Sequence, residues 1–207
     1  MKFISGNIYH VYNQGNNHQK IFLADKDYQT FLNYTERLIL PHSSILAYCL
    51  MPNHFHLMLH ANPSCDNIIQ QGNLLLDPLT NGFRKLLSGY ARTFNDQYEK
   101  SGSLFRQKTK AKCLSDYDLI NSGKSWALSD YYFNCFYYIH YNPVQTGLVL
   151  CENDWRWSSY RYYAGLEKLS ICNKELARSL DLYHENDVSL ATTRVDKEMM
   201  NSFQFKY

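Results

Sequence analysis

Several features that would assign a chain to a common class are missing from this sequence. Its six cysteines form no Cys-x-x-Cys pair, so a cysteine-rich zinc site is disfavoured. The opening residues contain no long apolar run, so the sequence predicts neither a secretory leader nor a membrane span. We therefore expect an intracellular protein whose cysteines are reduced and serve mostly as small core residues. Internal repeats and low-complexity tracts are absent as well.

Net charge is also scarce, because a balance of +2 is too small to argue for nucleic-acid binding. The charge is unevenly distributed, however. Residues 81–112 hold eight basic side chains and only two acidic ones. Such a stretch is typical of a phosphate-binding surface, although an ordinary solvated face fits equally well. The 18 tyrosines suit stacking on nucleic-acid bases and plain core packing alike.

The spacing of apolar residues predicts an α+β chain whose first half runs β-α-β-β. Asp25 is a candidate N-cap for a helix that stops before Pro41. Residues 62–80 read as loop with a short apolar piece. We expect strands at residues 7–14, 44–51, 54–60 and 104–114, helices after Asp25 and at 83–98 and 130–142, a helical turn at 116–120, and a weak helix at 173–182.

Alternation in the segment 54–60 (HFHLMLH) indicates a half-buried strand. His54 and His56 share one face, and Phe55 between them anchors the strand in the core. Two imidazoles on one face can bind a single divalent metal ion. The pair by itself does not separate a metal site from ordinary surface histidines.

The aromatic segment before Pro143 offers a reactive group and a further ligand. Tyr138 and Asn142 are four residues apart, so they project from one face of a helix. Tyr137 points about 100° away around that helix. On spacing alone, Tyr138 is better explained as a packed aromatic and Asn142 as an ordinary residue at a helix end.

Five segments carry a resemblance to a known family. MPNHFHLMLH (residues 51–60) resembles the His-hydrophobic-His (HUH) motif of single-tyrosine transposases, and YIHYNPVQTGLV (138–149) resembles the nucleophile segment of REP-associated tyrosine transposases. Three further segments also resemble the family and follow in the same order along the chain: IYHVYNQGNN, YARTFNDQYEKSGSLFRQ and DWRWSSYRYY. The resemblance covers roughly residues 5–165. We therefore expect a transposase domain at 1–165 and a C-terminal extension of unknown role at 166–207.

This resemblance implies a ferredoxin-like fold, with an antiparallel sheet and helices packed on one side. It implies that His54 and His56 are metal ligands, that Asn142 is the third ligand, and that Tyr138 is the nucleophile. The expected activity is cutting and joining of single-stranded DNA through a 5′-phosphotyrosine. Mg²⁺ is the ion that the resemblance implies, whereas a mixed imidazole and amide ligand set favours Mn²⁺ chemically.

The expected partner is single-stranded DNA with hairpin elements, in the cytoplasm and associated with the nucleoid. A homodimer and a monomer both remain open. Exposed aromatics such as Phe105 or Trp126 would stack on bases. The basic residues of the predicted strand 104–114 would share one face and meet phosphates, together with one residue of the preceding helix. These DNA-binding candidates are Arg106, Lys108, Lys110, Lys112 and Arg92.

Two other classes of function remain as alternatives. One is a hairpin-binding protein that derives from a transposase and has lost catalysis. It is disfavoured because His54, His56, Tyr138 and Asn142 are all present. The other is a small-molecule metalloenzyme that uses the same histidines. It leaves the basic segment unexplained, and no Asp or Glu ligand stands near the histidine pair.

Overall fold

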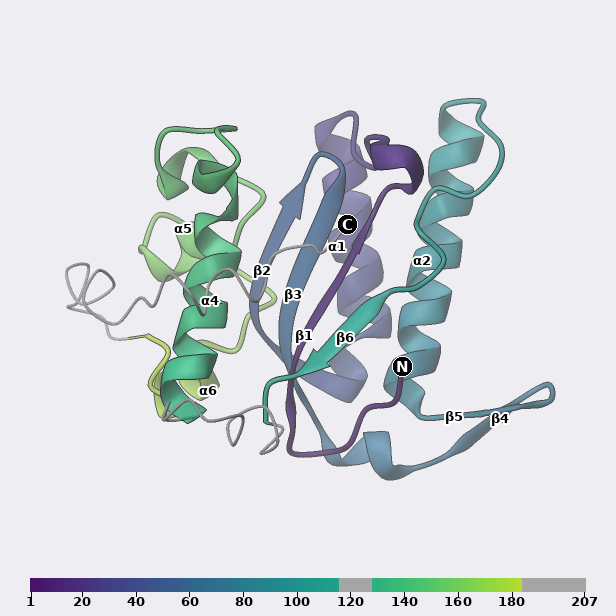
Figure 1. Cartoon of the computed structure of the whole chain (residues 1–207), viewed down its shortest axis with the longest axis horizontal. Coiled ribbons are helices and arrows are strands. Elements are labelled where there is room, and N and C mark those ends of the chain that lie inside the picture. The colour runs from purple at the N-terminus through teal and green to yellow at the C-terminus, as the bar shows by residue number, and fades with distance from the viewer. Residues whose placement is uncertain (116–127, 184–207) are drawn as a thin grey trace.

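The computed structural model describes residues 1–115 and 128–183, which form an antiparallel sheet with helices packed against it (Figure 1). Within these residues the main sheet has four strands in the order β2-β3-β1-β6. The predicted helical turn at 116–120 lies outside the described residues. The strands are β1 (Ile8–Gln14), β2 (Ser43–Met51), β3 (His54–Ala61) and β6 (Lys110–Cys113).

Helices α1 (Asp25–Leu38) and α2 (Pro78–Gln97) pack together over one face of the sheet (Figure 1). Phe55 of β3 points to that face, where its ring lies 5.0 Å from the ring of Phe31 in α1. The neighbouring His56 points the other way, because successive strand residues alternate. Its ring lies 5.4 Å from that of Tyr138 in α4 (Leu128–Gln145). The expected α+β class with a ferredoxin-like sheet and helix pair is confirmed.

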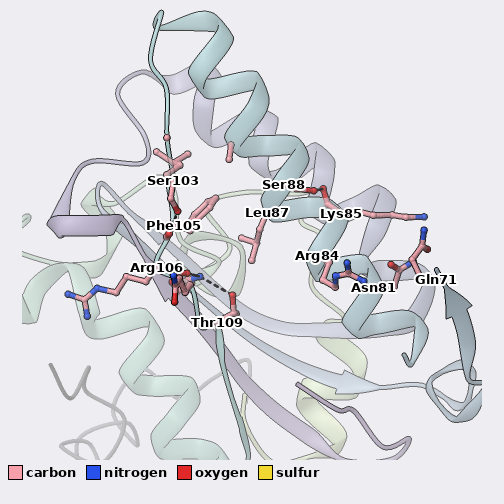
Figure 2. Close-up of a pocket in the computed structure, with 15 residues that line it drawn as sticks. Gln71, Asn81, Arg84, Lys85, Leu87, Ser88, Ser103, Phe105, Arg106 and Thr109 are labelled. Carbon is pink, nitrogen blue, oxygen red and sulfur yellow. Dashed lines mark hydrogen bonds between the residues drawn. The ribbon is translucent and has the colours of Figure 1, made fainter. Parts of the chain in front are cut away.

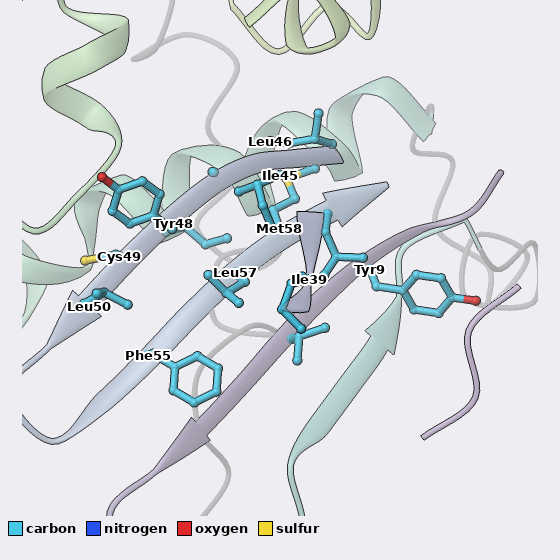
Figure 3. Close-up of a cluster of buried hydrophobic side chains, with 14 of the residues drawn as sticks. Tyr9, Ile39, Ile45, Leu46, Tyr48, Cys49, Leu50, Phe55, Leu57 and Met58 are labelled. Atoms are coloured by element: carbon cyan, nitrogen blue, oxygen red, sulfur yellow. The ribbon is translucent and has the colours of Figure 1, made fainter. Parts of the chain in front are cut away.

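The apolar core fills the space under α1 and α2 and fixes the position of β3. Phe55 and Leu57 are fully buried there, and Ile39 and Ile45 join them (Figure 3). Burying a side chain of this size contributes roughly 1.5–3 kcal/mol. The strand therefore cannot slip by one residue without exposing these side chains.

The start of α1 is held by Asp27, and the prediction that Asp25 caps this helix is wrong. The N-cap position is Ala24, which has no side-chain oxygen to offer. Asp27, three residues into the helix, instead accepts hydrogen bonds from the Ala24 N–H at 2.9 Å and from the N–H before it. Its carboxylate also accepts from Gln97 Nε2 at 2.9 Å and from the Tyr98 hydroxyl at 2.8 Å. Asp27 thus joins the start of α1 to the end of α2.

Helix α2 begins five residues earlier than the predicted start at Phe83. Asp77 caps it by accepting a 2.7 Å bond from the Thr80 N–H, and Pro78 occupies the first turn, where no N–H is required. Gly82 permits close packing of α2 against α1. A Cβ at this position would lie 2.4 Å from the Leu38 carbonyl oxygen of α1.

The predicted strand 104–114 is shortened to β6, and the preceding residues form irregular chain. Apart from a bridge between Gly15 and Phe105, residues 104–109 are not paired as strand. The Arg106 N–H still bonds to the Gln14 carbonyl at 2.9 Å, and the Asn13 side chain then bridges residues 106–109, because its Nδ2 donates to the Arg106 carbonyl at 3.1 Å and to Thr109 Oγ1 at 2.9 Å. Arg106 and Lys108 therefore lie ahead of the strand that carries Lys110 and Lys112.

The later elements pack against the edge formed by β2. Helix α4 extends past the predicted end at 142 and includes Pro143 in its last turn. The Asn173 N–H bonds to the Ile45 carbonyl at 2.8 Å, so the chain beyond 165 touches the sheet. The remaining elements are β4 (Ile69–Gln71), β5 (Leu74–Leu76), α5 (Tyr160–Tyr163) and α6 (Lys174–Ser179), with 3-10 turns η1 (Asn16–His18), η2 (Leu40–His42), η3 (Pro63–Asp66) and η4 (Glu152–Asp154).

All six cysteines fall within the described residues and are free, and four of them are buried. That agrees with their expected use as small core residues. Among residues 1–115 and 128–183, no helix is both long and apolar enough to cross a membrane.

Removing the Asp27 carboxylate tests its role as the link between α1 and α2. Asp27→Ala leaves several donors without an acceptor, so it should lower the free energy of unfolding by about 2–4 kcal/mol. Asp25→Ala is the matched control, because Asp25 is exposed and its carboxylate pairs with the exposed Arg156. It should cost less than about 1 kcal/mol in the same urea titration. Equal losses for both variants would contradict this account.

Candidate active site

The structure brings together the four residues predicted as catalytic and metal-binding. His54 and His56 lie on the β3 face that α4 covers, and their rings stand 5.1 Å apart and perpendicular. From α4, Asn142 Oδ1 reaches to 3.1 Å from His54 Nε2, and the Tyr138 ring meets His56 edge to face. All four side chains are buried. Tyr137 is directed elsewhere and stacks on another tyrosine of α4.

Two neighbours of the histidine pair were not predicted as site residues. His10 of β1 places its Nε2 2.9 Å from His56 Nδ1, and Asn53 places its Oδ1 2.7 Å from His54 Nδ1. The alternation of β1 did put His10 on one face with Tyr12. Only the pairing register, in which Tyr12 lies opposite His56, shows that this face is the one that α4 covers.

These contacts indicate which ring nitrogens face α4. A neutral imidazole carries a single N–H. When His54 donates from Nδ1 to Asn53, its Nε2 presents a lone pair toward Asn142. A lone pair facing an amide oxygen at 3.1 Å is repulsive, so either Asn142 turns its NH₂ to the ring or a cation lies between them. In the same way, donation from His56 Nδ1 to His10 leaves His56 Nε2 as its basic nitrogen.

Burial keeps the histidines of this region neutral. It lowers the pKa of His54 to about 4, opposed by a hydrogen bond with Asn142. It lowers the pKa of His10 to about 3, and the positive charge of Lys112 acts in the same direction. The pKa of His56 also lies well below its usual value, through burial and the adjacent His10 and His54. Neutral imidazoles are the form that binds metal ions.

The Tyr138 phenol is enclosed and remains protonated. Its side chain is 2% exposed, and burial raises its pKa above the usual value, while a hydrogen bond with Asn142 lowers it. A protonated phenol is a poor nucleophile, so nucleophilic chemistry at Tyr138 would need help from the groups around it. A macromolecular substrate could reach the oxygen only after α4 or the tyrosine side chain moved.

The donor set fits one divalent ion with mixed nitrogen and oxygen ligands. Oxygen and nitrogen ligands sit at roughly 2.0–2.2 Å from Mg²⁺, Mn²⁺ or Zn²⁺, which places adjacent ligands about 3 Å apart. The 3.1 Å between His54 Nε2 and Asn142 Oδ1 matches that spacing. No group of three or more His, Cys, Asp or Glu side chains among the described residues is arranged to hold a metal. A site here therefore depends on the Asn142 amide.

The five basic candidates divide between the two sides of the sheet. Lys112 lies opposite His10 in the β-ladder and Lys110 lies opposite Tyr12, so both belong to the face that carries the histidines. Arg106 Nη2 lies 3.3 Å from His18 Nε2, near the end of β1. Lys108 is exposed between them.

Arg92 does not join the other basic candidates. It projects from α2, on the opposite side of the sheet, and pairs at 3.8 Å with Asp96. Phe105 was expected to be exposed for stacking, but its ring is only 7% exposed and packs against the rings of Phe55 and Tyr90. Trp126 lies outside the described residues.

A paired-histidine strand under a tyrosine-bearing helix, on a ferredoxin-like sheet, is the arrangement expected of single-tyrosine transposases. Comparison with known proteins agrees. A protein of Haemophilus influenzae, provisionally named a REP-associated tyrosine transposase, is 29% identical over 118 residues. The match covers 56% of this chain and 57% of that relative, so only about half of its length is matched. No family model matches the chain.

The fold is similar to that of a solved REP-associated tyrosine transposase bound to a REP hairpin. The TM-score is 0.54 at 15% sequence identity, and the match covers 91% of this chain and 93% of the other. At that identity the likeness concerns the fold alone. The resemblance noted in the sequence is thus supported by a curated relative, and the structural neighbour supports the expected fold.

The buried histidines predict a steep dependence of stability on pH. His10, His54 and also His140, whose pKa burial lowers to about 3, take up protons in the unfolded chain below pH 6.5 but not in the fold. Their contribution to stability is present above pH 6.5 and is lost as the pH falls toward 4. Each adds a slope approaching about 1.4 kcal/mol per pH unit. Urea titrations of metal-free protein measure this slope.

His140→Gln tests one of these three histidines outside the candidate site, because His140 bonds to Ser159 Oγ at 2.7 Å and does not face that site. It should make the slope between pH 6.5 and 4 shallower, whatever its effect at pH 8. An unchanged slope would show that His140 is protonated in the fold.

Proposed function

We propose that this protein is a metal-dependent single-stranded DNA endonuclease and strand transferase of the transposase type, with Tyr138 as nucleophile. The observation that carries the proposal is the meeting of His54, His56, Tyr138 and Asn142 from two distant segments. Packing alone does not require two histidines, an amide and a phenol to gather at one buried point. Similarity to REP-associated tyrosine transposases supports the same reaction class.

In the proposed reaction the Tyr138 oxygen attacks the phosphorus of a DNA phosphodiester. The bond between phosphorus and the 3′-oxygen breaks, the 3′-end leaves as a hydroxyl, and the 5′-phosphate stays on the tyrosine. Attack by a 3′-hydroxyl on this phosphotyrosine rejoins a strand without ATP, because one phosphoester is exchanged for another. In the first step the phenol loses its proton and the leaving 3′-oxygen gains one. The raised pKa of the phenol makes this loss costly.

His54, His56 and Asn142 are the residues that would hold the Mg²⁺ or Mn²⁺ ion. When bound, such an ion polarises the phosphate and stabilises the leaving 3′-oxygen. Asn53 and His10 would fix the two rings so that each Nε2 faces the ion. The proposed site is complete within one chain, so a homodimer is not required to assemble it, and a monomer and a homodimer both stay open.

DNA would be held by cations beside this site. Lys110 and Lys112 flank the histidine face, and Arg106 and Lys108 continue the basic segment toward the end of β1. Phosphate contacts of this kind position a strand without reading its sequence. Arg92 lies across the sheet, so its proposed role requires DNA that extends to that side.

A substitution of the phenol separates catalysis from binding. Tyr138→Phe should abolish the covalent protein–DNA band formed with single-stranded hairpin DNA and Mn²⁺, and it should leave hairpin affinity within about twofold, because only one oxygen is removed. Denaturing gel electrophoresis detects the band. Tyr137→Phe on the neighbouring helix position should react normally.

The same assay distinguishes the alternatives. A non-catalytic hairpin-binding protein would bind the DNA without forming an adduct in the wild type. A small-molecule metalloenzyme would do neither. Normal cleavage by the Tyr138→Phe protein would refute the nucleophile assignment.

The contact between His10 and His56 predicts that substitutions of His10 change the affinity of the protein for Mn²⁺, measured without DNA. His10→Phe fills similar space but cannot accept the N–H of His56, so it should weaken Mn²⁺ binding by about 10- to 100-fold. His10→Gln retains an acceptor and should restore most of the affinity. Isothermal titration calorimetry measures both, with thermal denaturation as the check on folding. Wild-type affinity in the His10→Phe protein would remove His10 from the proposed site.

A further inference from the structure

The Gln14 side chain carries a buried polar group that has no role in the candidate site so far. The residue is 2% exposed and lies at the end of β1, directly opposite His54 in the β-ladder. Residues opposite each other in a ladder share one face of the sheet, with Cβ atoms about 4.5–5.5 Å apart. Gln14 therefore stands beside His54 on the face that α4 covers.

The fold uses one end of the Gln14 amide. Its Nε2 lies 2.7 Å from His18 Nδ1, whereas Oε1 is enclosed and makes no hydrogen bond to any residue in 1–115 or 128–183. Enclosing an amide oxygen or nitrogen without a partner is costly, so such groups are usually satisfied. The exception at Gln14 indicates that a bound group completes the amide.

The contact with His18 indicates which end of the amide is left over. Arg106 Nη2 lies 3.3 Å from His18 Nε2, and a guanidinium can only donate, so His18 Nε2 accepts there. A neutral imidazole then has its single N–H on Nδ1, which needs an acceptor. The two ends of an amide have the same shape, so a half-turn brings Gln14 Oε1 to this 2.7 Å contact. The enclosed end is then the NH₂ group, which is a donor.

The residues that orient Gln14 are themselves fixed. The turn that returns His18 to β1 closes on Gly15, where a Cβ would lie 2.1 Å from the Gln19 carbonyl oxygen. His18 has a left-handed backbone with a φ of 58°, a strain that persists only where the surroundings hold it. Arg106 donates its N–H to the Gln14 carbonyl at 2.9 Å. Its side chain points away from the cavity of about 470 Å³ beside α2 (Figure 2).

A donor at this position complements the other groups of the candidate site. His54 and His56 present lone pairs from Nε2, and Tyr138 presents the attacking oxygen. Lone pairs attract a cation but repel the oxygens of a phosphate. Negative charge that grows on those oxygens during attack is stabilised by N–H donors that are already in place.

We propose that Gln14 donates a hydrogen bond from its NH₂ group to a non-bridging oxygen of the phosphate that Tyr138 attacks, and that His18 and Arg106 hold the amide in this orientation. The inference rests on the proposed function, because that function supplies the phosphate. Gln14 neither gains nor loses a proton in the step. Its hydrogen bond strengthens as charge grows on the phosphate oxygens, so it lowers the barrier more than it tightens binding.

Substitutions at Gln14 separate donation to phosphate from metal binding. Gln14→Leu should slow formation of the covalent band with single-stranded hairpin DNA and Mn²⁺ by about 100-fold or more. Its affinity for Mn²⁺ without DNA should stay within about twofold, whereas loss of a group that supports the metal costs about 10- to 100-fold. Gln14→Glu keeps an acceptor for His18 but loses the donor, so it should be equally slow. Gln29→Leu, exposed on α1, is the matched control and should react normally.

A double-mutant cycle tests whether His18 acts through Gln14. His18→Asn tolerates the left-handed backbone but is shorter, so it loses the contact and should slow the adduct about tenfold. Added to Gln14→Leu, it should cause no further loss, because the amide that it orients is already absent. Losses that add would overturn the orienting role of His18.

The Gln14 contact is measured without catalysis in the Tyr138→Phe protein. The side-chain NH₂ signals of Gln14 in ¹⁵N NMR are identified by their loss in Gln14→Leu. They should shift downfield when hairpin DNA is added in the presence of Mg²⁺, and they should stay in place with Mg²⁺ alone. The imidazole ¹⁵N signals of His18 in the free protein should place its proton on Nδ1.

Three results would overturn the proposal: a normal rate in Gln14→Glu, a shift with Mg²⁺ alone, or a proton on His18 Nε2. The nuclease reaction is scored separately, by the adduct of the wild type. An adduct without a DNA-induced shift at Gln14 would keep the nuclease and refute the Gln14 contact. A shift without any adduct would keep the contact with DNA phosphate and refute the nuclease.

Discussion

The rest of the structure depends on strand β3, because its alternating side chains place core residues on one face of the sheet and candidate site residues on the other. Phe55 and Leu57 are driven into the layer beneath α1 and α2, and this leaves His54 and His56 no position except beneath α4. A slip of one residue would exchange the two sets completely. The buried apolar residues of the strand therefore fix the positions of the two histidines on its other face.

The polar side is itself ordered by a second ring of contacts. Asn53 lies within hydrogen-bond distance of His54 Nδ1, His10 lies within hydrogen-bond distance of His56 Nδ1, and Asn142 contacts His54 Nε2 from α4. None of these contacts involves a carboxylate, so the site consists of buried neutral groups, with the positive charge of Lys112 acting on His10. Such an environment strengthens any interaction with a cation or a phosphate that enters it.

Patterns that depend on local spacing could be predicted from the sequence, and patterns that depend on register could not. The alternation of residues 54–60 placed both histidines on one face, and the i, i+4 rule placed Tyr138 and Asn142 together. The role of His10 required knowing which strand lies beside β3. The early start of α2 was missed because Pro78, which the structure places in the first turn of the helix, was read as part of a loop. Strand 104–114 was overextended because the side chain of Asn13, and not a backbone ladder, holds the chain between Arg106 and Thr109.

The enclosure of Tyr138 has a consequence for fidelity. A tyrosine that is 2% exposed leaves no room for a phosphodiester, so the resting protein and any covalently loaded form must differ in the position of α4 or of the Tyr138 side chain. Opening that layer costs packing energy, which only a well-matched substrate can return through its own contacts. Under the proposed reaction, mismatched strands would bind the surface and dissociate uncut. Selectivity would then arise from the free energy needed to expose Tyr138 as well as from contacts with the DNA.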